Sequence, residues 1–150
     1  VAAGVSLTAK RNEKSYRSYV ILGDGELQEG QTWEAAMFAA SHHLNNLCLI
    51  IDLNSLQVEG HTDKVLKMEP IDKKFEAFGW NTIMVDGHNF SDLRDAFTSA
   101  SNEIKKPTVL IAKTLVGKGC LSLEGQLSHN MILPQNVAIR ALEELGERYD

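Results

Sequence analysis

Two apolar runs, each followed within two residues by a residue with a side-chain oxygen, constrain this chain more than any other feature. Residues 19–22 lead into a glycine-rich turn that contains Asp24, and residues 47–53 lead to Asn54. A helical pattern rich in small residues, 31–44, joins the two runs. The order strand, helix, strand predicts a parallel sheet with a right-handed crossover, in which both polar residues lie at the carboxyl edge. We expect this edge to hold a metal ion and a diphosphate, because it combines oxygen ligands with a glycine turn that opens a helix.

The remainder of the chain alternates helices and strands in the same way, which predicts an α/β fold with a parallel sheet flanked by helices. The expected strands are residues 18–22, 47–53, 81–85 and 108–112, and the expected helices are 1–10, 31–44, 71–78, 91–103 and a last one from Pro134 to a stop at Gly146. Residues 55–65 and 116–133 are expected to form loops. The first ten residues resemble the interior of a helix without an N-cap, so we expect residues 1–150 to be a single domain that is incomplete at its N-terminus.

The bulk composition is that of an ordinary globular domain. The chain has 150 residues, of which 43% are hydrophobic and 23% are charged, enough for one sizeable core. The net charge of -5 argues against nucleic acid as a partner. No apolar run approaches the ~18 residues that a membrane span needs. There are only two cysteines, Cys48 and Cys120, and the cytoplasm is the expected compartment.

The polar residues at the two strand ends suit a hard divalent cation such as Mg²⁺ or Ca²⁺, which takes oxygen ligands. Asp24 offers a carboxylate, Asn54 an amide oxygen, and Leu56 a backbone carbonyl just beyond the strand. The N–H of Gly25 can face a diphosphate, because glycine lets the backbone approach closely. A simple strand–turn–helix connection would explain the glycines but not the paired Asp and Asn. The glycine spacing fits neither the dinucleotide fingerprint nor the P-loop.

These residues resemble a known family. Gly23-Asp24-Gly25 followed by Asn54 resembles the signature of thiamine diphosphate enzymes, and the sequence over residues 23–35 resembles transketolase in particular. The resemblance continues through residues 54–60, 78–80, 85–88, 106–108 and 113–119, and it covers residues 1–120 well. It implies the diphosphate-binding (PP-type) domain of the thiamine diphosphate-binding fold.

The resemblance also implies how the cofactor is held. Asp24, Asn54 and the carbonyl of Leu56 are expected to ligate Mg²⁺ or Ca²⁺. The same three residues are expected to contribute to thiamine diphosphate binding, together with Gly23, Gly25, Glu26 and Val58. Among these, Gly25 is expected to touch the diphosphate, and the apolar side chain of Val58 to pack against the cofactor.

Two further residues match positions with catalytic roles in the family. Glu29 corresponds to a glutamate in a carboxylate relay between the two active sites of a dimer, although an acid is also favoured near any helix N-terminus. His129 lies where the family has a histidine that reaches the diphosphate and the substrate. Asn130 replaces the glycine that normally follows, which leaves a plain loop histidine as the alternative. Trp33 is expected in the core, and His61 and His88 in polar loops.

The activity implied is that of a transketolase-like transferase of the pentose phosphate pathway, which moves a two-carbon ketol unit between sugar phosphates. The glutamate that activates the cofactor lies on a pyrimidine-binding domain or subunit that this chain lacks. We therefore expect a homodimer or heterotetramer, and no activity from the chain alone. The alternatives are a different thiamine diphosphate enzyme and a non-catalytic interaction module of the same fold.

Overall fold

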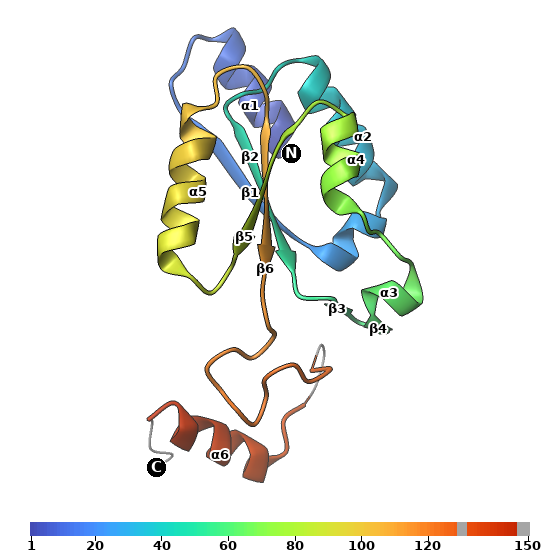
Figure 1. Cartoon of the computed structure of the whole chain (residues 1–150), viewed down its shortest axis with the longest axis vertical. Helices are drawn as coiled ribbons and strands as arrows, with labels where there is room; N and C mark the ends of the chain where they lie inside the picture. The colour runs from blue at the N-terminus through green and yellow to red at the C-terminus, as the bar shows by residue number, and fades with distance from the viewer. Residues whose placement is uncertain (129–131, 147–150) are drawn as a thin grey trace.

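The computed structural model describes residues 1–128 and 132–146. Its central sheet contains β1 (Ser18–Gly23), β2 (Leu47–Leu53), β5 (Asn81–Asp86) and β6 (Thr108–Lys113). All neighbouring strands are parallel, in the order β1-β2-β6-β5 (Figure 1). Gly23 pairs with Asp52, and Lys113 pairs with both Leu53 and Asp86, so the four carboxyl ends share one edge. The predicted parallel sheet and its polar edge are confirmed.

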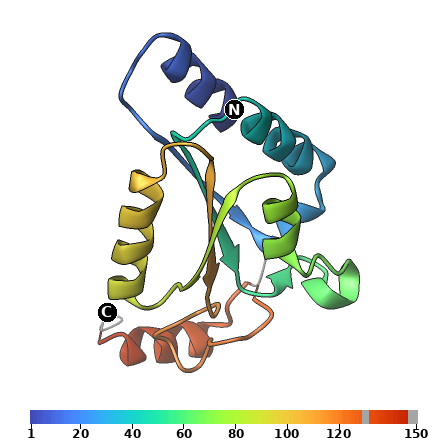
Figure 2. The same ribbon diagram turned by 45° about the horizontal axis from the view of Figure 1, so that its top comes forward.

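Helices cover both faces of this sheet (Figure 2). One face packs against α1 (Ala2–Arg11), α2 (Gly30–Ser41) and α4 (Ile71–Ala77), while α5 (Phe90–Asn102) covers the other. Side chains alternate between the two faces: Leu49 and Ile51 join the first core, and Cys48 joins the second. The central strands β2 and β6 are apolar on both sides for this reason.

Several predicted boundaries are wrong in detail. The glycine turn contains a short 3-10 helix, η1 (Asp24–Gln28). The helix expected to reach residue 44 ends at Ser41, because His43 adopts a left-handed φ of 50° and turns the chain toward β2. Residues 55–65, expected to be a loop, form a hairpin of β3 (Leu56–Gln57) and β4 (Gly60–His61), followed by the single turn α3 (Thr62–Val65).

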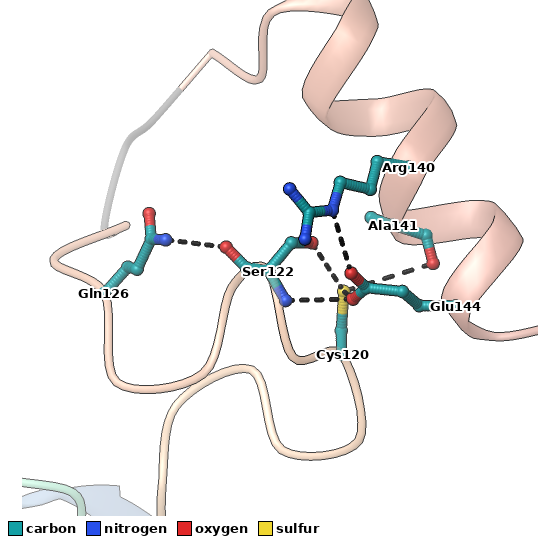
Figure 3. Close-up of polar contacts among 6 residues, drawn as sticks. All are labelled: Cys120, Ser122, Gln126, Arg140, Ala141 and Glu144. Carbon is teal, nitrogen blue, oxygen red and sulfur yellow. Dashed lines mark hydrogen bonds and ion pairs between the residues drawn. The ribbon is translucent and has the colours of Figure 1, made fainter.

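The last helix, α6 (Gln135–Glu144), lies beyond the carboxyl ends of the strands (Figure 1). It is tied to the loop that follows β6 through Glu144, as Figure 3 shows. The backbone N–H of Ser122 donates to Glu144 Oε2 at 2.9 Å, and Cys120 Sγ lies 3.3 Å from the same oxygen. Gly146 follows the helix with a φ of 79°, so the predicted glycine stop is confirmed.

The strand β1 is an edge strand with one face poorly covered. Its side chains Val20 and Leu22 pack into the first core, but Ile21 on the opposite face is 70% exposed and Tyr19 is 52% exposed. Phe97 of α5 reaches Tyr19, with ring centroids 6.0 Å apart. Within the described part of the chain, no helix has the length and apolar character needed to cross a membrane.

Candidate functional site

Asp24 is the buried acid at the end of β1. Its side chain is among the least accessible in the protein, with 2% of the residue exposed. Oδ2 accepts hydrogen bonds from the Ser55 N–H at 2.8 Å and from the Thr62 hydroxyl at 3.2 Å. Oδ1 is equally buried but has no hydrogen-bond partner among the described residues. Burial raises the pKa of Asp24, and hydrogen bonding by the Ser55 N–H, the Thr62 hydroxyl and the nearby Gly25 N–H opposes that rise.

A buried carboxylate oxygen without a partner is costly, because it has lost its water and gained nothing in return. The arrangement makes sense if a cation completes it. One oxygen of Asp24 fixes the carboxylate to the segment that follows β2, and the other is left for a ligand.

Asn54 closes the same site from the end of β2. Its Oδ1 accepts a hydrogen bond from the Leu56 N–H at 2.9 Å, and its Nδ2 donates to Asp52 Oδ2 at 3.0 Å. Between Asn54 and Leu56, Ser55 adopts a left-handed φ of 64°. This turn lets the Ser55 N–H reach Asp24 while the backbone runs on into β3. The structure therefore places Asp24 beside the turn that Asn54, Ser55 and Leu56 form.

The glycine at position 25 allows the hairpin of β3 and β4 to come close. A Cβ built on Gly25 would lie 2.9 Å from the Cβ of Gln57, which is closer than real contacts of this kind. An open groove of about 780 Å³ runs along this contact. It is lined by Gly23, Gly25, Glu26, Gln28, Glu29, Gln31, Asn54, Leu56, Gln57, Val58 and Glu59. Val58, at the hairpin tip, is 56% exposed and offers an apolar surface in this mostly polar groove.

The two glutamates of the turn differ in their roles. Glu26 folds back on the strand end, where its Oε2 accepts a hydrogen bond from the Gly23 N–H at 2.7 Å. Glu29 directly precedes α2, lines the groove and makes no capping hydrogen bond with its side chain. Its carboxylate is thus available to a group that enters the groove.

His129 lies outside the described residues, and its role stays a prediction. The other residues singled out from sequence take structural positions. Trp33 packs against Phe75 with ring centroids 5.2 Å apart and donates to the Leu27 carbonyl at 2.6 Å, which confirms it as a core residue. The Nε2 of His88 accepts a hydrogen bond from the Leu115 N–H at 2.8 Å, so this histidine joins two loops.

Three polar residues of the site were not predicted from sequence. Thr62 binds Asp24 from the start of α3, Asp52 binds the Asn54 amide, and Thr114 binds Asp52 from beyond β6. A partial signal existed for Asp52, which is the one charged residue in the apolar run 47–53. The contacts of Thr62 and Thr114 depend on packing between distant segments, so no local sequence pattern predicts them.

The residues present fit a hard cation that carries a diphosphate. The available ligands are oxygens from a carboxylate, an amide and a backbone carbonyl, which is the set that Mg²⁺ and Ca²⁺ prefer. The unpartnered Oδ1 of Asp24 can supply the charge, and Gly25 brings backbone without a side chain to the wall of the groove. Phosphate groups commonly bind backbone N–H groups.

Several known proteins resemble this chain. Residues 6–146 match the family model described as "Transketolase, thiamine diphosphate binding domain". The 6-deoxy-6-sulfo-D-fructose transketolase subunit SqwG of a Clostridium species is 39% identical over 145 residues, which cover 96% of this chain and 53% of that protein. The transketolase of Homo sapiens is 42% identical over 146 residues, covering 96% of this chain and 23% of that protein.

The fold agrees as well. The crystal structure of transketolase from Campylobacter jejuni superposes with a TM-score of 0.90 at 33% sequence identity. The superposition covers 98% of this chain and 24% of that one. This chain therefore spans about half of the subunit-sized relative and about a quarter of the longer ones.

Proposed function

The chain belongs to the transketolase family through its thiamine diphosphate-binding domain, and we propose that it anchors the cofactor through Mg²⁺ or Ca²⁺ in an enzyme that transfers a two-carbon ketol unit between sugar phosphates. The observation that carries this proposal is the buried Oδ1 of Asp24, which lacks a partner among the described residues. Its carboxylate is bound to the turn formed by Asn54 and Leu56, and that turn lines a groove of suitable chemistry.

In this proposal each residue of the site has a binding or positioning task. Asp24, Asn54 and the Leu56 carbonyl hold the metal ion, and the Gly25 N–H donates to the diphosphate. Val58 presents apolar surface to the thiazolium end, while Gly23 and Glu26 shape the turn. When bound, thiamine diphosphate supplies the electron sink for the transferred carbanion.

Two residues are proposed to act closer to the reaction. Glu29 stands at the groove without a capping contact, where it can relay a proton toward a second site across a dimer. His129 is proposed to reach the diphosphate and the substrate. The open position of Glu29 is consistent with a group that becomes buried only when a partner chain docks.

The partner is proposed to carry the pyrimidine-binding domain, as a further domain or as a separate subunit in a homodimer or heterotetramer. Support comes from the description of SqwG as a transketolase subunit and from the fraction of each relative that this chain spans. The chain alone is expected to show no turnover of ketose and aldose phosphates. Measurable turnover by the purified chain without a partner would contradict this.

The cofactor proposal is tested by calorimetry with thiamine diphosphate, with and without Mg²⁺, on the assembled enzyme. We expect binding that requires the metal. Asp24→Ala should abolish metal-dependent binding, since it removes the only carboxylate of the proposed ligand set. The matched control is Asp95→Ala, an exposed acid on α5 that pairs with Arg94, and it should bind like wild type. If the assembled wild-type enzyme bound no cofactor, the non-catalytic interaction module would become the better account.

A further inference from the structure

We infer that Asp52 and Thr114 are positioning residues of the metal site. Thr114 holds the carboxylate of Asp52, and this carboxylate holds the amide of Asn54 with its oxygen directed to the proposed ion. The inference rests on the proposed function, because it assigns a role toward the cation that Asp24 and Asn54 are proposed to bind.

The first step is the orientation of the Asn54 amide. Its Nδ2 lies 3.0 Å from Asp52 Oδ2, and its Oδ1 lies 2.9 Å from the Leu56 N–H. An ionised carboxylate only accepts hydrogen bonds, and a backbone N–H only donates. Rotating the amide by half a turn would place its oxygen against the Asp52 carboxylate, so that two acceptors face each other. It would also place its NH₂ group against the Leu56 N–H, so that two donors face each other. The two contacts together therefore select a single orientation.

The second step is what this orientation achieves. An amide oxygen has two lone pairs, of which the Leu56 N–H uses one. The other is free to bind a cation, and an oxygen is the ligand that Mg²⁺ prefers. Without Asp52, the amide would lose the acceptor for its Nδ2. Only the Leu56 N–H would then remain to orient the amide, so the oxygen would be held less firmly toward the ion.

The third step is how Asp52 itself is held. The Thr114 hydroxyl donates to Asp52 Oδ1, leaving Oδ2 for Asn54. The Thr114 N–H also donates to the Leu53 carbonyl at 3.2 Å, which anchors the residue beside β2. Both oxygens of the Asp52 carboxylate are thus assigned, and its plane is fixed.

Gly87, which directly follows β5, completes the arrangement. Its N–H donates to the Lys113 carbonyl at 2.8 Å. A Cβ at this position would lie 2.5 Å from the Thr114 Cγ2 and 3.0 Å from the Lys113 oxygen. The absence of a side chain at Gly87 therefore makes the room that Thr114 occupies. Contacts from the ends of β5, β6 and β2 converge in this way on one proposed metal ligand.

The test measures the affinity of the assembled enzyme for Mg²⁺ in the presence of thiamine diphosphate, by calorimetry and without reference to turnover. Asp52→Ala should weaken Mg²⁺ binding by ~10–100-fold, the usual effect of removing a residue that orients a metal ligand. Thr114→Val, which keeps the shape and removes the hydroxyl, should weaken binding by ~10-fold. Thr114→Ser restores the hydroxyl and should bind like wild type.

A double-mutant cycle distinguishes the proposed positioning of Asn54 from a general disruption of the structure. Because Thr114 acts through Asp52, the double variant Asp52→Ala, Thr114→Val should bind no more weakly than Asp52→Ala alone. Thr82→Val is the matched control: the Thr82 hydroxyl on β5 is buried without a partner among the described residues, so its loss should not affect Mg²⁺ binding. Circular dichroism of each variant verifies that the fold is retained.

The outcomes distinguish this inference from the proposed function. If wild type shows metal-dependent cofactor binding and the folded Asp52→Ala and Thr114→Val variants bind as tightly, the positioning role is overturned and the proposed function stands. If wild type itself does not bind, both are overturned. Additive losses in the double variant would likewise exclude the relay from Thr114 through Asp52.

Discussion

At the scale of single residues, individual atoms of the site determine which contacts can form. The two oxygens of the Asp24 carboxylate illustrate this, since one is satisfied twice by Ser55 and Thr62 and the other by nothing among the described residues. Gly25 is a second example, because even a methyl group at this position would collide with Gln57. The site thus leaves one carboxylate oxygen without a partner among the described residues, and it has room for Gln57 beside Gly25.

The substitution Gly25→Ala tests the second of these features. We expect it to displace the β3–β4 hairpin, to lower the free energy of unfolding by ~1–3 kcal/mol through overpacking, and to weaken cofactor binding. The measurements are chemical denaturation of the chain and calorimetry of the assembled enzyme.

The control for Gly25→Ala is Gly4→Ala. Gly4 lies within α1, and a Cβ there would meet nothing within 4 Å. Alanine is favoured over glycine in a helix by ~1 kcal/mol, so this variant should be at least as stable as wild type and should bind normally. Equal stability of the two variants would mean that the contact with Gln57 imposes no constraint.

The sequence was informative about the residues that follow a strand directly. Asp24 and Asn54 could be placed because an apolar run shows where a strand ends, and parallel strands end together. The contacts of Thr62 and Thr114 could not be placed in this way. The hydrogen bond from Thr62 to Asp24 spans 38 residues and the one from Thr114 to Asp52 spans 62, so both depend on the tertiary fold.

At the scale of elements, prediction worked for long periodic segments and failed for short ones. The strands and the helices α2, α4, α5 and α6 lie within a few residues of where the sequence predicts them. The hairpin of β3 and β4 was missed, because two-residue strands are too short to show an alternating pattern. Ile104 lies past the end of α5 and is 74% exposed.

The docking of α6 gives a prediction that depends on pH. The Ser122 N–H, followed by contacts with Cys120 and Arg140, lowers the pKa of Glu144. A carboxyl group whose pKa is lowered by folding stabilises the folded form above its unfolded pKa, and this contribution is lost as the pH falls through the folded value. Protection of the Ser122 N–H from hydrogen exchange should therefore decrease in that acidic range.

Glu144→Gln should remove this pH dependence and reduce the protection of the Ser122 N–H already at neutral pH. The matched control is Glu143→Gln, on the same helix but without a contact to the loop among the described residues, which should leave the exchange unchanged. If both variants behaved like wild type, Glu144 would have no part in holding α6 to the loop shown in Figure 3.

At the scale of the whole molecule, the uncovered face of β1 is an exposed apolar part of the sheet. Ile21 and Tyr19 lie on an edge strand, and unpaired edges with apolar side chains favour association. We expect the isolated chain to self-associate in analytical ultracentrifugation. Ile21→Lys should shift the distribution toward the monomer.

Ile104→Lys provides the comparison, because Ile104 is as exposed as Ile21 but lies off the sheet. It should leave the association unchanged. A monomeric wild-type chain at high concentration would show that this face does not drive association.

The position of the proposed ligands at the two ends of the β1–α2–β2 crossover has a consequence for the stability of the fold. Asp24 and Asn54 become neighbours only after this crossover has closed, so a cofactor that bridges them binds the native state and not the unfolded chain. By mass action, a ligand at about one hundred times its dissociation constant adds about 2.7 kcal/mol to the free energy of unfolding. If the proposed function holds, the folded fraction of the chain rises with the concentration of free thiamine diphosphate.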